Sequence, residues 1–372
     1  MNVSRYNYRS QFDGCLTNVL DQLQRILIDG SYILGDDVTT FEESFARFVG
    51  SRYCVGVNSG TDALIMALVA CGLGTGSRIA VQANTFYATL LAILRVGAVP
   101  VLIDADPTTF LMDLDALERE RKLDAILPVH LFGLASDLTR IRRHAERVGA
   151  IVIEDCAQAH GAVHNGRMTG VYGSVGCFSF HPSKNLAAAG DAGACVTNNH
   201  RIAERLRQLR NLGQSEQNDH VVVGFNSRLD AIQAVVLNAK LPKLNGWNAA
   251  RIAIAKRYRT ELSGLPVSFQ STGDPEEHVY HLFQLRTGAR DALLEHLQAN
   301  GIEATIRYPV PIPRQRVFSN LGWTEGVYPV ADALASELLC LPMRPDVTEG
   351  EVEQVVTSVR DFFLKKAGAL AL

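Results

Sequence analysis

Apolar and polar positions form alternating blocks along the first part of the chain. Short runs that are continuously apolar lie at residues 79–83, 99–103, 125–129 and 151–153. Segments with helical periodicity lie between them, at residues 63–70, 89–94 and 138–148. Strands that are buried on both faces read as continuous apolar runs, and the helices that connect them cover the sheet. The pattern therefore predicts an α/β fold with an open, mostly parallel sheet.

The pattern changes in the last third of the chain. Helical patterns at 229–240 and 248–262 are followed by the turn Gly264-Leu265-Pro266 and then by a strand-like run at 281–285. Two further helical patterns lie at 291–299 and 349–365. This mixture predicts a smaller α+β domain. Because 372 residues exceed the usual size of one hydrophobic core, we expect a large domain over 1–245, including the N-terminal segment, and a smaller one over 246–372.

Composition excludes several classes of protein. The chain is 47% hydrophobic and 20% charged, and its net charge of -3 comes from well-mixed signs, which excludes a basic grip on nucleic acid or a membrane surface. No run approaches the roughly 20 apolar residues of a membrane helix, and the first residues resemble no signal peptide. Seven cysteines without a Cys-x-x-Cys pair argue against a disulfide framework and a zinc site. We expect a cytoplasmic protein.

A carboxylate and a lysine are the first candidates for chemistry. Asp155 follows the apolar run 151–153, and ligands bind at the carboxyl ends of parallel strands. A buried carboxylate needs a partner, which is a ligand cation, a helix end or a structural ion pair. Lys184 lies in a turn between an apolar run and the small-residue loop 187–194. An isolated lysine is usually only solvated, but a pyridinium cofactor needs a lysine for its aldehyde and a carboxylate for its ring nitrogen.

A polar turn, Asn58-Ser59-Gly60-Thr61, leads into the helical pattern at 63–70. Amides at a helix N-terminus beside a hydroxyl bind phosphate, although ordinary capping by Ser59 or Thr61 explains the turn equally well. The glycine-rich run 72–76 follows a helical pattern rather than a strand, so it does not fit a dinucleotide fingerprint. We predict a turn there.

Four motifs in a fixed order carry a family resemblance. They are Ser59-Gly60-Thr61, Glu154-Asp155-Cys156-Ala157-Gln158, Phe178-Ser179-Phe180 with Lys184-Asn185-Leu186, and Gly224-Phe225-Asn226-Ser227-Arg228-Leu229-Asp230. From about Tyr32 to the C-terminal helix, the sequence resembles the DegT/DnrJ/StrS family of sugar aminotransferases, which depend on pyridoxal 5'-phosphate (PLP). The resemblance implies the aspartate-aminotransferase-like (type I PLP) fold and a homodimer with shared active sites.

The resemblance also implies a role for each matching residue. Lys184 corresponds to the lysine that binds PLP covalently and later moves a proton, and Asp155 to the carboxylate that pairs with the pyridine nitrogen. Gln158 corresponds to the residue beside the ring hydroxyl, and Phe86 to the aromatic side chain that stacks on the ring. The expected phosphate contacts are Gly60, Thr61, Ser179 and, from the neighbouring subunit, Asn226.

The substrate side of the family pattern is less regular in this chain. Asp191-Ala192-Gly193 replaces the usual Asp-Gly-Gly, and Arg307-Tyr308-Pro309 replaces His-Tyr-Pro. The stretches 158–161 and 224–230 are more similar to relatives that act on dTDP-linked 3-keto-6-deoxy sugars. The expected reaction moves the amino group of glutamate to such a sugar nucleotide. The expected substrate contacts are His160, Arg307 and Tyr308, although a packed structural His160 is equally compatible with the sequence.

Other interpretations stay open at this point. The substrate is alternatively a 4-keto sugar nucleotide or a keto-cyclitol. A PLP-dependent sugar dehydratase is disfavoured because such relatives have histidine in place of Lys184. A non-catalytic regulator is disfavoured because the site residues are intact and no basic stripe is present. We interpret His130 as structural, and His278 and His281 as the beginning of a strand rather than as metal ligands.

Overall fold

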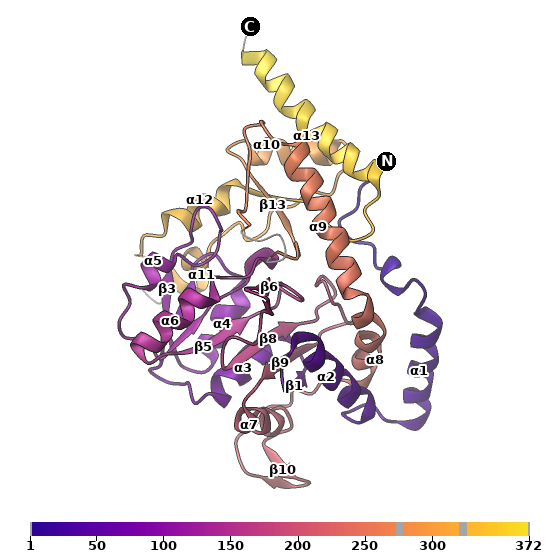
Figure 1. Ribbon diagram of the computed structural model, residues 1–372, viewed down its shortest axis with the longest axis vertical. Coiled ribbons are helices and arrows are strands. Elements are labelled where there is room, and N and C mark those ends of the chain that lie inside the picture. The colour runs from indigo at the N-terminus through magenta and orange to yellow at the C-terminus, as the bar shows by residue number, and fades with distance from the viewer. Residues whose placement is uncertain (1, 273–277, 320–325, 371–372) are drawn as a thin grey trace.

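A seven-stranded sheet lies at the centre of the molecule, for which the computed structural model describes residues 2–272, 278–319 and 326–370 (Figure 1). In sheet order, the strands are β1 (Tyr53–Val57), β9 (Gly193–Thr197), β8 (Val175–Ser179), β5 (Ile151–Asp155), β4 (Ala125–Leu127), β2 (Arg78–Gln82) and β3 (Val99–Ile103). Neighbours from β8 to β3 are parallel, whereas β9 is antiparallel to both β8 and β1. The predicted mostly parallel sheet is confirmed.

Helices cover both faces of this sheet. The sheet belongs to the larger of two units of the molecule. The helices of this unit are α1 (Leu16–Asp29), α2 (Asp36–Val49), α3 (Gly60–Ala70), α4 (Tyr87–Arg95), α5 (Leu114–Leu117), α6 (Leu138–Val148), α7 (His200–Arg210) and α8 (Ala231–Lys240). In β2, Ile79 and Val81 join the core formed with α3 and α4, whereas Ala80 packs on the other face with α6. Alternate side chains of one strand point to opposite faces, which is why the buried strands read as continuous apolar runs.

A second, smaller unit follows the sheet. Its antiparallel sheet has the order β12 (Ser268–Phe269), β13 (Phe283–Arg286) and β14 (Leu338–Leu341). The helices after α8 are α9 (Leu244–Glu261), α10 (Arg290–Ala299), α11 (Arg316–Ser319), α12 (Pro329–Glu337) and α13 (Glu349–Leu370). Side chains of α9, α10 and α13 share a core with β13 and β14. We propose that the domain boundary lies near residue 245, as predicted, in the first turn of α9.

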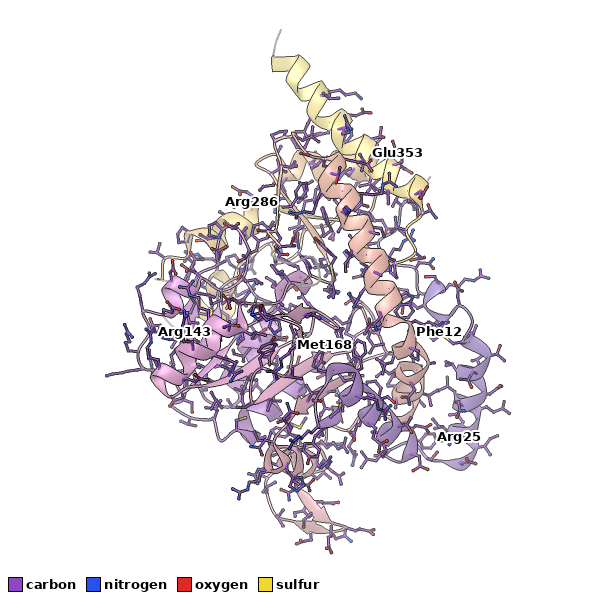
Figure 2. The ribbon with its side chains drawn as sticks, in the orientation of Figure 1. Phe12, Arg25, Arg143, Met168, Arg286 and Glu353 are labelled. Atoms are coloured by element: carbon purple, nitrogen blue, oxygen red, sulfur yellow. The ribbon has the colours of Figure 1, made fainter. Side chains whose placement is uncertain are left out.

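The N-terminal segment packs on this smaller unit and not on the large sheet. Val3 pairs with Ile302 and is part of the core around α9 and α13. Figure 1 shows the N-terminus beside these two helices. Further along, the Phe12 ring lies 4.1 Å from Nζ of Lys240 at the end of α8, close to the junction of α8 and α9 that Figure 2 shows.

Short elements complete the chain. The two-stranded ribbons are β6 (Val163–His164) with β7 (Arg167–Met168) and β10 (Gln214–Glu216) with β11 (Asp219–His220). The 3-10 helices are Ser10–Phe12, Leu131–Gly133, Leu241–Lys243 and Ile312–Arg314. The glycine-rich run 72–76 forms the turn between α3 and β2, as predicted. No helix within the described ranges has both the length and the apolar character that a membrane span requires.

Candidate active site

A cavity of about 270 Å³ lies at the carboxyl ends of β5 and β8, between the large sheet and the smaller unit. Most of the residues predicted to bind cofactor or substrate share its wall. The wall is made of Ser59, Gly60, Thr61, Leu64, Thr85, Phe86, Ala88, Val129, Asp155, Ala157, Gln158, Ser179, His181, Ser183, Lys184, Asp191, His281, Leu282, Arg307 and Tyr308. Of the predicted site residues, His160 and Asn226 lie elsewhere.

Asp155 is the last residue of β5, and its side chain is buried. One carboxylate oxygen accepts a hydrogen bond from the Thr89 hydroxyl (2.9 Å), and the other accepts one from the Ala157 backbone N–H (3.1 Å). Burial raises the pKa of this carboxyl, while the two hydrogen bonds and the nearby Lys184 ammonium act in the opposite direction. The carboxylate is held in place by a hydroxyl and an amide, and among the described residues no basic side chain is hydrogen-bonded to it.

Lys184 lies in the turn after β8, where its backbone N–H donates to the carbonyl of His181 (2.8 Å). Its side chain is half-buried in the cavity wall. The pKa of its amine is lowered to about 8, mainly by desolvation; the charge of Asp155 opposes this change and the positive charge of Arg307 adds to it. A neutral, nucleophilic amine is therefore accessible close to neutral pH, which the interpretation as a solvated surface lysine does not provide.

Two glycines bring the N-terminus of α3 directly against the sheet. A Cβ atom on Gly60 would lie 2.6 Å from Cβ of Ser179, and one on Gly193 would lie 2.4 Å from the Ser59 backbone. The Ser59 hydroxyl accepts from the Asp62 N–H (3.1 Å), so Ser59 has the ordinary capping role. The free amides of the first turn and the helix dipole make this end of the cavity suitable for a phosphate.

Aromatic rings and one amide form the wall opposite the sheet end. Gln158 accepts from the Phe132 backbone N–H through Oε1 (2.7 Å) and donates to the Tyr308 hydroxyl through Nε2 (2.8 Å), so its amide has one orientation. The Tyr308 ring lies 5.9 Å from the ring of Phe86, which is the N-cap residue of α4 and is 53% exposed. This exposed aromatic surface is suited to stacking with a flat ligand.

His160 does not reach the cavity, which corrects the predicted sugar contact. Its ring is fully buried between Phe178 and Phe180, with ring centres 5.5 and 5.6 Å away. Burial lowers its pKa to about 3, and the charge of Lys184 acts in the same direction, so the ring is neutral. Its Nε2–H donates to the carbonyl of Ser179 (2.8 Å). The alternative interpretation as a packed histidine fits this position.

Asn226 is exposed and lies outside the cavity of its own chain. It pairs with Asn211, close to the β10–β11 ribbon that protrudes from the lower end of the molecule in Figure 1. Its expected contact with the phosphate in a neighbouring subunit therefore stays a prediction.

His130 has a structural position, where both of its ring nitrogens are hydrogen-bonded. His130 Nδ1 accepts from the Ser136 N–H (3.0 Å), so its Nε2–H donates to the buried Glu154 carboxylate (3.2 Å). Glu154 also accepts backbone N–H groups from Gly170, Tyr172 and Gly173. His130, Glu154 and Cys156 lie close enough to hold a metal ion, but the hydrogen bonds already use the histidine and the carboxylate. We therefore interpret this cluster as structural.

Thr89 and His281 are among the functional residues that sequence reasoning missed. Thr89 supports Asp155 from α4, and no pattern along the chain marks a contact between residues so far apart. His281 lines the cavity and lies 3.2 Å from the Asn185 side-chain oxygen; it was predicted to begin a strand, but β13 begins at Phe283. His278 is separate, because its Nε2 bonds to Gln270 (3.0 Å) and its ring stacks on Tyr280.

Comparisons with known proteins agree with this site. The sequence model of the DegT/DnrJ/EryC1/StrS aminotransferase family matches residues 16–360. The UDP-N-acetyl-3-dehydro-alpha-D-glucosamine 3-aminotransferase of Acidithiobacillus ferrooxidans is 41% identical, over 96% of this chain and 97% of its own. The dTDP-3-amino-3,4,6-trideoxy-alpha-D-glucose transaminase of Streptomyces venezuelae is 40% identical, over 95% and 92%. The crystal structure of DesV from S. venezuelae in complex with a ketimine intermediate superposes with a TM-score of 0.94 at 38% identity, over 97% and 98%.

Fold and site together define a PLP-dependent aminotransferase with the type I fold. The chain belongs to the DegT/DnrJ/EryC1/StrS aminotransferase family. The fold, reaction class and cofactor predicted from the sequence are confirmed.

Proposed function

We propose that this enzyme transfers the amino group of glutamate to the 3-keto group of a nucleotide-linked sugar, with a dTDP-linked 3-keto-6-deoxyhexose as the substrate. The observation that carries the proposal is one cavity wall shared by Lys184, Asp155 and the N-terminus of α3. The position of the keto group is supported by the two relatives described above, whose names specify a 3-dehydro or a 3-amino sugar. The dTDP-linked 6-deoxy sugar is supported by the stretches 158–161 and 224–230.

The residues of the cavity fit PLP. Gly60 allows the first turn of α3 to pack against Ser179, because a Cβ atom there would lie 2.6 Å from Cβ of Ser179, and this helix end favours phosphate. The buried Asp155 carboxylate has a raised pKa and gains from a cation beside it, as the pyridinium nitrogen is. The exposed ring of Phe86 offers a surface for stacking, and Gln158 lines the same cavity.

In the proposed chemistry, Asp155 acts on the proton at the pyridine nitrogen and Lys184 acts on the proton at the reacting carbon. PLP, when bound, supplies an electron sink for the charge that develops at the reacting carbon. Asp155 holds a proton at the pyridine nitrogen, and its own charge is fixed by Thr89 and the Ala157 amide. Lys184 Nζ takes the proton from the amino-bearing carbon of the donor, as a general base whose pKa is suited to this work. A positioned carboxylate in a low-dielectric site stabilises the positive charge of the protonated pyridine nitrogen more than water does.

We further propose a homodimer in which Asn226 completes the phosphate site of the partner. The support is a group of exposed apolar side chains on α1 and beside Asn226, which a monomer leaves in water. They are Leu16, Leu20, Leu27, Ile28, Val221, Val223 and Phe225.

A panel of acceptors tests the proposed substrate. The holoenzyme is incubated with glutamate and, in turn, a dTDP-linked 3-keto-6-deoxyhexose, its 4-keto isomer, a UDP-linked 3-keto N-acetylhexosamine and a keto-cyclitol. Products are identified by mass spectrometry, with Lys184→Ala as the matched blank. We expect the amino product from the dTDP-linked 3-keto sugar at the highest kcat/KM. Turnover of the 4-keto isomer or the cyclitol in preference to both 3-keto compounds would refute the proposal.

A further inference from the structure

Arg307 places an unpaired cation in the wall of the cavity. Its Nη2 donates to the Tyr6 hydroxyl (2.9 Å), and within the described residues its buried Nε has no acceptor. Arg307 and Lys184 line the same cavity, and the charge of Arg307 contributes to the lowered pKa of the Lys184 amine. A half-buried guanidinium without an anion is costly, because desolvation is not offset by a partner. This part of the cavity is therefore suited to a negatively charged group.

The N-terminal segment holds this guanidinium in place. The Arg5 backbone N–H donates to the Glu303 carboxylate (2.8 Å), which fixes the segment on the smaller unit beside α9 and α13 (Figure 1). The Arg5 side chain also donates to the Tyr6 hydroxyl (2.5 Å), and its guanidinium carbon lies 4.5 Å from the centre of the Tyr6 ring. One phenol oxygen thus accepts from two arginines, so both charges are directed to the same region and neither is neutralised by this contact.

We propose that Arg307 binds the α-carboxylate of the amino-acid donor and that Tyr6 is the residue that positions its guanidinium. This inference rests on the proposed function, because it names the group that the same cavity recognises in the donor. The planar fork of a guanidinium forms two parallel hydrogen bonds with a carboxylate, which a histidine at position 307 cannot do.

The position of Arg307 favours the donor carboxylate over the diphosphate of the sugar nucleotide. In an amino acid, the reacting amine and the α-carboxylate are attached to the same carbon, so a carboxylate must lie near Lys184 during the reaction. In a 3-keto sugar nucleotide, ring carbons and the anomeric oxygen separate the reacting carbon from the diphosphate. A cation on the cavity wall that Lys184 also lines is therefore placed for the first anion rather than for the second.

Separate half-reactions test this assignment in the holoenzyme. Conversion of the PLP form by glutamate and of the aminated form by the sugar nucleotide are each followed by absorbance in single turnovers. For Arg307→Gln we expect the apparent Kd for glutamate to rise about 10- to 100-fold, the usual effect of losing a hydrogen bond to a charged group, with the apparent Kd for the sugar nucleotide unchanged. Arg307→Lys and Tyr6→Phe should give smaller increases, because each keeps a positive charge near the site. Arg360→Gln, which changes an exposed arginine on α13, is the matched control.

Binding without turnover provides a second measurement. The cofactor-free protein is titrated by calorimetry with two stable compounds, the reduced phosphopyridoxyl adducts of glutamate and of 4-aminobutyrate, of which only the first has an α-carboxylate. Wild type should prefer the glutamate adduct by about 10- to 100-fold, and Arg307→Gln should lose this preference.

An unchanged preference in Arg307→Gln would overturn the inference. A loss confined to the sugar nucleotide half-reaction would also overturn it, because Arg307 would then bind the diphosphate. A wild-type enzyme that accepts no amino-acid donor would contradict the proposed function instead, while the two adducts would still test Arg307.

Discussion

Burial acts in opposite directions on the pKa values of the two charged groups in the cavity. It lowers the pKa of Lys184 to about 8 and raises the pKa of Asp155. Both changes favour the neutral forms of the side chains. The neutral amine is the nucleophile that the aldehyde of PLP requires, and the carboxylate regains its favourable charged state when a cation binds beside it. Burial of these two side chains therefore destabilises the charged groups in the cofactor-free site, and cofactor binding removes this destabilisation.

Asp155→Asn should separate stability from catalysis. In the folded protein the carboxyl has a raised pKa, so its ionisation costs stability as pH rises from the unfolded value through the folded one. The asparagine variant lacks this cost, and its cofactor-free form should be at least as stable as wild type at neutral pH. Turnover should fall about 10²- to 10³-fold, because a neutral amide does not hold the ring-nitrogen proton. Thermal melts between about pH 4 and pH 8 and steady-state kinetics measure the two effects.

The control is Asp361→Asn, which changes an exposed carboxylate on α13 and should alter neither quantity. Wild-type turnover in Asp155→Asn would remove the role assigned to this carboxylate.

The pH dependence of cofactor uptake should report the pKa of Lys184. The neutral amine attacks the aldehyde, so the rate of PLP uptake by the cofactor-free enzyme should rise with pH and level off near the lowered pKa of about 8, not near the ordinary value of about 10.4. Arg307→Gln should move the inflection to higher pH, and Arg307→Lys should move it less. Stopped-flow absorbance measures the rates, and an inflection at the ordinary lysine value would contradict the structure.

Single residues were predictable where a ligand defines them and not where packing does. Lys184, Asp155 and Gln158 lie on the cavity wall because the family motifs follow the cofactor. His160 is only two positions after Gln158, yet the turn directs it between two phenylalanines in the core. Thr89 reaches Asp155 across the fold, and such a contact leaves no trace in the local sequence.

At the level of elements, several of the continuously apolar strands were predictable, whereas β1, β9 and β14 were not. The predicted run 99–103 coincides with β3, and 138–148 coincides with α6. The pattern did not reveal β1 or β9, and β9 begins with the small residues Gly, Ala and Cys. In β9 this composition has a structural cause, because Gly193 has no space for a side chain beside Ser59. The small residues that make β9 difficult to recognise in the sequence also allow the N-terminus of α3 to pack closely at the phosphate end of the cavity.

Gly60→Ala should damage the junction between α3 and β8. The new methyl group would lie 2.6 Å from Cβ of Ser179, and overpacking of this kind costs about 1–3 kcal/mol. We expect a corresponding loss in the free energy of unfolding by urea, together with weaker PLP retention on dialysis. The control is Gly246→Ala in α9, where nothing lies within 4 Å of the new atom. That change should be neutral or stabilising by about 0.5–1 kcal/mol, and equal stability of the two variants would contradict this interpretation.

For the molecule as a whole, the cavity depends on segments far apart in the chain. Lys184 and Asp155 come from the large sheet, whereas His281 and Arg307 come from the smaller unit. The sequence predicted both units, but it contained no signal that the N-terminal segment would pack on the second one. That contact joins two distant segments through Arg5 and Glu303, and it is decided by tertiary packing.

Mixed dimers should test whether Asn226 acts across the subunit boundary. Lys184→Ala and Asn226→Ala subunits are combined and allowed to exchange. If Asn226 serves the partner's site, each mixed dimer has one site with both native residues, so about a quarter of all sites recover. Activity and PLP retention after exchange measure this recovery. No recovery above the sum of the two parent variants would show that both residues serve the same subunit.

A crystal structure of the PLP-bound enzyme tests the central claim most directly. We predict a covalent bond from Lys184 Nζ to the aldehyde carbon of PLP, with the Asp155 carboxylate within hydrogen-bond distance of the ring nitrogen at the far side of the same ring. A cofactor attached to another lysine, or a ring nitrogen directed away from Asp155, would contradict the account.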